Sequence, residues 1–162
     1  MNEWKRAARK ALVSGTTASL LSTAALALAG KAEHNAPAGP INGPSQWVFG
    51  RRAAHRRQAS LRYTLTGFLI HHASAMGWAL LHERVFGRGK QPPTTARIMR
   101  NAALTATVAN FVDYKLTPKP LQRGFQAQLS KKSLLVVYAA FAAGLTIYEL
   151  AKSRRQRKIS AR

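Results

Sequence analysis

Four apolar stretches without a formally charged residue alternate with dense Lys and Arg clusters along the chain. They cover residues 11–30, 63–82, 101–112 and 133–148. A bilayer core is about 30 Å thick and is crossed by about 20 apolar residues in a helix. The pattern therefore predicts an all-α fold, an integral membrane four-helix bundle with transmembrane helices at 11–30, 61–82, 97–116 and 133–151.

The third predicted span is the most polar of the four. Arg97, Arg100, Asn101, Asn110 and Asp113 all lie within it. Such a helix inserts into a membrane only if its polar faces turn toward other helices. Proline supports the boundaries, because all seven prolines fall outside the predicted spans.

The first 29 residues allow two interpretations. Ala27 and Ala29 form an A-x-A pattern at which a signal peptidase could cut. Small residues such as Gly15 and Ser22 are instead typical of a helix that packs closely against others in lipid. We favour a retained first helix, and the rest of the topology is the same either way.

Residues 31–60 form a long connection that is rich in Pro, Gly and Asn and ends in an arginine run. Its prolines argue against a regular helix. Aromatic residues beside arginines suit the lipid headgroup level, which predicts an interfacial connector. The alternative is a structured loop that closes over the bundle or binds a ligand, since long loops are often functional. The candidate loop residues are Asn35, Pro37, Pro40, Asn42, Pro44 and Trp47.

The chain carries 26 Lys and Arg against 5 Asp and Glu, a net charge of +21. This charge would suit nucleic acid, but the cations flank the apolar stretches, which favours a bilayer with anionic headgroups as the partner. A count of 15 basic residues on one side of the spans against 11 on the other predicts both termini in the cytoplasm, including a basic tail at 152–162. Cysteine is absent, so disulfides and thiolate metal sites are excluded.

Histidines in the second span are the first candidates for chemistry. His71 and His72 lie at mid-depth, where an imidazole can hydrogen-bond another helix, relay protons or bind a metal or haem. We favour the hydrogen bond. Other spans carry no histidine for bis-histidine haem, and the Glu-x-x-His repeats of a di-metal site are missing, so we predict no metal and no cofactor. The candidate polar residues within the membrane are His71, His72, Trp78, His82, Asn110 and Asp113.

The few acidic residues predict ion pairs between helices. If consecutive spans are antiparallel neighbours, Asp113 meets Arg62 at one face, while Glu83 and Glu149 share the other face with Arg97 and Arg100. Alternatively, Asp113 and Asn110 line a polar cavity that opens outward. Two pairs of small residues, Ala140 with Gly144 and Ala73 with Gly77, are predicted helix contacts.

Three segments carry a resemblance to a known group: APAGPINGPSQWVFG, TLTGFLIHHASAMGWALLHE, and Asp113-Tyr114 followed by LTPKPLQRGF. Together they resemble a group of small multi-span inner-membrane proteins of proteobacteria that has no known activity. The resemblance implies a bacterial inner-membrane setting, and it directs attention to His71, His72 and the proline-rich loop.

These observations predict a small polytopic inner-membrane protein and favour a non-enzyme over an enzyme. It would act by helix–helix association as a homo-oligomer or with a membrane-protein partner. One alternative is a proton-relay or transport component that uses His71 and Asp113. Another is a lipid- or quinone-linked redox protein with its site at His71, His72 and Trp78. The chain contains no dinucleotide, P-loop, zinc-protease or hydrolase motif.

Overall fold

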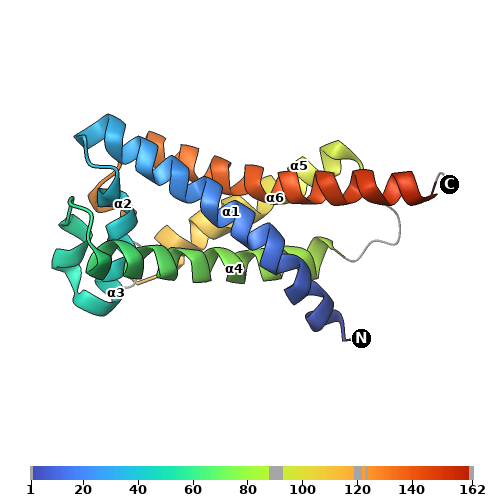
Figure 1. The fold of residues 1–162 in the computed structure, drawn as a ribbon, viewed down its shortest axis with the longest axis horizontal. Helices are drawn as coiled ribbons and strands as arrows, with labels where there is room; N and C mark the ends of the chain where they lie inside the picture. Colours follow the sequence, from blue (N-terminus) through green and yellow to red (C-terminus); the bar gives the residue numbers. More distant parts are fainter. Residues whose placement is uncertain (1, 88–92, 119–121, 123, 161–162) are drawn as a thin grey trace.

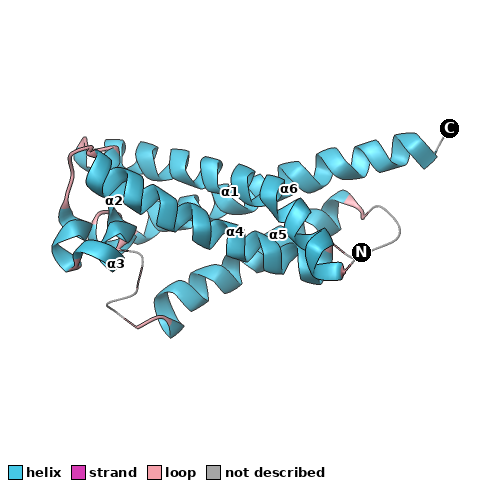
Figure 2. Ribbon diagram, turned by 60° about the horizontal axis from the view of Figure 1, so that its bottom comes forward, coloured by secondary structure: helices cyan, strands magenta, loops and turns pink. Residues whose placement is uncertain are grey.

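A computed structural model describes residues 2–87, 93–118, 122 and 124–160, the last five by their backbone alone. Within these residues the chain is helical and contains no strand (Figure 2). The predicted all-α fold class is therefore confirmed. Arg88 and Lys90, which enter the count of basic residues, lie outside the described residues.

The four predicted spans correspond to the long helices of the described chain. These are α1 (Glu3–His34), α4 (Thr66–Phe86), α5 (Thr95–Phe111) and α6 (Lys131–Ser160). Single π-helical turns extend two of them, η3 (Leu61–Leu65) before α4 and η4 (Val112–Leu116) after α5. Most of the predicted tail continues α6 as helix, and residues 161–162 lie outside the described residues. Among the described helices, α1 and α6 are long and apolar enough to cross a membrane. The structure alone does not establish α4 and α5 as spans.

Helix α1 lies at the centre of the packing. It runs along both α4 and α6, and α5 packs mainly on α6 (Figure 1). Both chain termini lie at one end of the bundle, which we call the terminal end. The short helices α2 (Ala38–Asn42), η1 (Gly43–Ser45), α3 (Gln46–Phe49), η2 (Arg51–His55) and η6 (Phe125–Ala127) gather at the opposite end. We call residues 36–58 and 124–129 the cap.

The proline-rich loop is helical in short pieces, contrary to the expectation that its prolines would prevent helix formation. Pro37 is the N-cap of α2, Pro40 is the third residue of α2, and Pro44 is the second residue of η1. All three prolines thus lie in or just before a first turn, where the missing N–H has no intrahelical partner to lose. Proline therefore limits the length of these helices without excluding them.

Two buried amides hold the cap together. The fully buried Asn42 donates to the carbonyl oxygens of Arg56, at 2.8 Å, and Gln58, at 3.0 Å, and accepts from the Thr64 hydroxyl at 2.7 Å. Gln128, also buried, donates to the Ala54 carbonyl at 2.9 Å. The connection at 31–60 is thus a structured loop packed on the bundle end, rather than only an interfacial connector.

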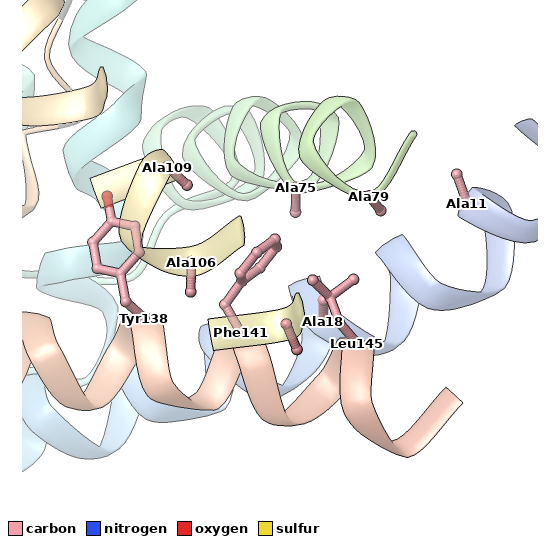
Figure 3. Packing of buried hydrophobic residues seen from close by; sticks show 10 residues of the cluster. Ala11, Ala18, Ala75, Ala79, Ala106, Ala109, Tyr138, Phe141 and Leu145 are labelled. Atoms are coloured by element: carbon pink, nitrogen blue, oxygen red, sulfur yellow. The ribbon is translucent and has the colours of Figure 1, made fainter. Parts of the chain in front are cut away.

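Small side chains fill the interior between the long helices. Seven of the ten buried residues in the main core cluster are alanines: Ala11, Ala18, Ala75, Ala79, Ala102, Ala106 and Ala109. Figure 3 shows Phe141 and Leu145 projecting from α6 toward Ala75 and Ala79 of α4. A Cβ added to Gly144 would lie 2.4 Å from the Cα of Ala18, so α1 and α6 meet at backbone distance.

The second small-residue pair does not make the contact expected of it. Ala73 and Gly77 are exposed, and a Cβ added at Gly77 would have no neighbouring atom within 4 Å. Helix α4 instead turns Met76 and Ala79 toward Gly15 of α1, where an added Cβ would meet the Met76 sulfur at 2.6 Å. The adjacent face of α4 therefore packs on α1.

Large apolar side chains lie on the outside of the bundle. They are about half exposed or more and occur on all four long helices: Leu12, Leu20, Leu28, Leu69, Leu81, Leu104, Val108, Phe111, Leu135, Val136 and Ile147. Buried positions include Ser14, Ser19, Ser22, His71 and Thr105. The bundle thus exposes more large apolar side chains, and buries more small polar ones, than is usual for a protein that folds in water.

The two glycines provide a matched test of this packing. Gly144→Ala should destabilise the bundle by about 1–3 kcal/mol, because the new methyl group overlaps the α1 backbone. Gly77→Ala makes the same change in open space, so it should be neutral or stabilising by up to about 1 kcal/mol through helix propensity. Detergent-induced unfolding followed by circular dichroism measures both, and equal effects would contradict the close α1–α6 contact.

Candidate functional site

Two buried histidines of α4 bridge to different helices. The Nε2 atom of His71, which is 3% exposed, lies 2.9 Å from the Ser22 hydroxyl of α1. The Nδ1 atom of His82 lies 2.8 Å from the Thr105 hydroxyl of α5. Both contacts are of the interhelical kind that stabilises bundles in lipid. This arrangement agrees with the hydrogen-bonded histidine favoured from the sequence.

The other aromatic candidates of α4 lie beside this pair. His72 stacks on Phe68 one turn earlier, with 5.7 Å between ring centroids, and is partly exposed. Trp78 is partly buried and packs against the main core cluster. His71 itself meets the ring of Phe125 from the cap edge-on, with centroids 5.6 Å apart. The cap therefore covers the histidine directly.

Asp113 lies in the π-helical turn η4, where the Thr117 amide bonds to the Val112 carbonyl at 2.9 Å. Its carboxylate is 7% exposed and accepts a hydrogen bond from the Tyr138 hydroxyl of α6 at 2.5 Å. Single π turns are rare and frequently occur at functional sites. Here the π turn contains Asp113, whose carboxylate contacts α6.

An open groove of about 400 Å³ runs past Asp113 at the cap end. Its lining includes Trp47 from the cap, Ser74 and Trp78 from α4, and Thr117. The sequence raised a polar cavity lined by Asp113 and Asn110 as an alternative; Asp113 does line this groove, but the groove is mostly apolar. Asn110, its expected companion, lines a different groove between α5 and α6.

A small cavity of about 10 Å³ separates the histidine from the acid. His71, Ser22, Trp78 and Tyr138 are among its lining residues. This volume is close to the minimum needed for one water molecule. Because Tyr138 also bonds Asp113, one side chain lies between the two predicted relay residues.

Arg62 does not pair with Asp113, contrary to the sequence prediction. Its guanidinium lies over the Phe49 ring, 4.6 Å from the centroid, and over the Tyr63 ring at 5.6 Å. Arg62 belongs to the exposed start of η3, whereas Asp113 turns inward toward α6. The carboxylate therefore meets a tyrosine of α6 and not a cation of the neighbouring span.

The pairing of Glu83 and Glu149 with Arg97 and Arg100 is also not observed. Glu149 accepts from Lys152 one turn later on α6, at 3.0 Å, and Glu83 faces Lys10 of α1 and Lys152. Both arginines of α5 are exposed. The prediction failed because both arginines lie on the exposed face of α5, while Glu83 turns toward α1 and α6.

Most of the candidate loop residues have structural roles. Asn35 ends α1 in the left-handed conformation, with φ of 52°, which asparagine tolerates better than most residues. Pro40 and Pro44 are buried in the cap, and Pro37 is exposed at the start of α2. Trp47 alone combines 44% exposure with a place in the Asp113 groove.

Several partners of these residues were not identified from the sequence, among them Ser22, Thr105, Tyr138 and Lys10. Ser22 was noted only as a small residue for packing, and Lys10 only as a flanking cation. Helical spacing indicates that a position is buried, but it does not indicate which polar group of another helix that position will contact. Among the described residues, no group of three or more His, Asp or Glu is placed to hold a metal ion.

Comparison with known proteins adds no relative. No protein-family model, curated protein or solved structure matches the chain.

The Asp113–Tyr138 bond can be tested with a double-mutant cycle. Tyr138→Phe should cost roughly 1.5–3 kcal/mol of stability, because it removes a donor from a buried carboxylate. Combined with Asp113→Asn, the loss should be smaller than the sum of the two single losses. Arg62→Gln is the control, and its effect should add to that of Asp113→Asn. Coupling of Asp113 to Arg62 in unfolding measurements would contradict the observed arrangement.

Proposed function

We propose that the chain is a four-span inner-membrane protein that acts by lateral association of its helices with a second copy or with another membrane protein. The distribution of side chains supports a membrane setting. Large apolar residues are exposed on the outside of all four helices, and the inside is rich in alanine and contains several polar residues beside a few large apolar ones. In a bilayer these outer apolar side chains would contact acyl chains without a free-energy penalty, whereas in water their apolar surface would remain exposed at a free-energy cost.

The surface for association in this proposal is the groove between α5 and α6. It has a volume of about 560 Å³ and an almost entirely apolar lining. Five lining residues are alanines, so another helix can approach closely: Ala103, Ala106, Ala139, Ala142 and Ala143. Asn110 and Thr107 add polar groups that an acyl chain cannot satisfy and a second helix can.

The proposed topology has both termini in the bacterial cytoplasm. The position of both termini at one end of the bundle is compatible with an even number of spans. The larger number of basic residues at this end supports its cytoplasmic location. The cap would then lie at the outer surface, with the arginines at 51, 52, 56 and 57 at the level of anionic headgroups.

Two exposed alanines provide the test. Ala143→Leu places a large side chain in the groove, and Ala24→Leu makes the same change on the exposed face of α1. In vesicles that contain donor- and acceptor-labelled full-length chains, energy transfer should fall severalfold for Ala143→Leu and remain for Ala24→Leu. Absence of transfer in the wild type at every protein-to-lipid ratio would contradict self-association, and equal effects of the two changes would contradict the groove.

A second candidate function is proton transfer through His71 and Asp113. The observation that favours it is Tyr138, which bonds Asp113 and lines the cavity next to His71. One water in that cavity would complete a hydrogen-bonded connection from His71 to the groove at Asp113. His71→Gln keeps hydrogen-bonding capacity but cannot carry a proton at neutral pH.

Proton flux into vesicles tests this candidate. Wild-type vesicles should acidify faster than protein-free vesicles under an imposed potential, and His71→Gln and Asp113→Asn should each slow this flux about tenfold or more. His72→Gln is the matched control, because His72 lies outside the connection and should leave the flux unchanged. Wild-type vesicles as impermeable as protein-free ones would exclude the relay.

A further inference from the structure

Glu83 is a buried carboxylate that neither function above uses. It lies near the terminal end of α4 and is 2% exposed. Neither carboxylate oxygen accepts a hydrogen bond within the described chain. The Ser14 hydroxyl, which faces it from α1, donates instead to the Lys10 carbonyl at 3.2 Å. Buried carboxylates normally accept such bonds, so this one needs an explanation.

The cations near Glu83 already have other acceptors. Lys10 of α1 donates to the Gly87 carbonyl at 2.7 Å, and Lys152 of α6 donates to Glu149 at 3.0 Å. On α4 itself, Arg84 pairs with Glu3 at 2.9 Å. Lys10, Lys152, Glu83 and Glu149 together carry no net charge when all four are ionised. The remaining titratable groups close to this cluster are His82 of α4 and Tyr148 of α6.

A cavity at the terminal end lies against this buried residue. The cavity has a volume of about 60 Å³, and its lining includes Glu83, Lys10, Arg6, Glu3 and Gly87. Water fits in a polar space of this size. Glu3 and Arg6 are exposed, so the cavity leads to the surface. A Cβ on Gly87 would lie 2.8 Å from Oε2 of Glu83, so the backbone of this glycine lies directly against the carboxylate.

We propose that Glu83 is a proton-binding site of the terminal end, loaded from water in this cavity. The carboxylate takes the proton from a hydronium ion, which leaves water, and becomes a neutral acid. The charge of the four-residue cluster then changes from zero to +1. Lys10 and Arg6 line the same cavity and disfavour a metal cation as the ligand.

The electrostatics of the site agree with this geometry. Burial, and secondarily the charge of Glu149, raises the pKa of Glu83 to about 7. The pKa of Glu83 is higher in the folded chain than in the unfolded chain, where it is about 4.5. Protonated Glu83 therefore contributes to folding stability in full below pH about 4.5, and this contribution is lost as the pH rises through about 7. The site would therefore exchange its proton in the neutral range.

Infrared difference spectroscopy of the full-length chain in vesicles tests the proposal. Between pH 5 and 9, the wild type should lose the carbonyl band of one carboxylic acid with a midpoint near neutrality. Glu83→Gln should remove this band, and Glu3→Gln, the matched change at an exposed carboxylate, should keep it. Persistence of the band in Glu83→Gln, or its absence from the wild type throughout this range, would overturn the proposal.

Two further variants keep the test decisive if Glu83→Gln does not fold. Glu149→Gln removes a negative neighbour and should move the midpoint to lower pH, whereas Lys10→Met removes a positive neighbour and should move it to higher pH. Opposite shifts identify Glu83 as the titrating group. A midpoint that neither change moves would place the titrating acid elsewhere and overturn the assignment.

Discussion

The close contact of α1 with α4 and α6 is the constraint on which the rest of the structure depends. Gly15 and Gly144 bring the helices to distances at which a single added methyl group would collide with a neighbour. Where α1 crosses α4 at Gly15 and α6 at Gly144, only small residues fit on the glycine side of the contact, and close packing there includes backbone contact. The alanine-rich core of α1, α4, α5 and α6 follows from this geometry.

A core of small residues has two consequences for function. First, many large apolar side chains lie outside, where they form an extended apolar surface. Second, helices this close allow short polar side chains to meet across them, as in the bonds from His71 to Ser22 and from His82 to Thr105. The same closeness buries Glu83 between α1, α4 and α6. The candidate sites are therefore products of the packing.

The sequence predicted the helices well because charge and proline mark their ends. It predicted poorly which helices are neighbours. The pairing of Glu83 with Arg97 assumed that Glu83 faces α5, whereas it faces α1, which supplies Lys10. Periodicity identifies the faces of a helix but carries no information about the partner on each face.

The cap was the other part that the sequence did not determine. Its prolines suggested irregular structure, but their positions in first turns permit short helices. The buried bonds of Asn42 and Gln128 join residues far apart in the chain. No local pattern predicts such bonds, because each depends on how the loop returns to the bundle. The π turn that contains Asp113 is equally a product of tertiary packing.

The central claim, that all four helices lie in lipid with their large side chains outward, is tested most directly by photolabelling. A lipid-borne carbene reagent, read residue by residue by mass spectrometry, should label Leu20 and Val136 and, equally, Leu69 of α4 and Val108 of α5. Ala18 and Ala75, buried in the interior, should remain unlabelled. Labelling confined to α1 and α6, with Leu69 and Val108 modified by a water-soluble carbene instead, would contradict the account.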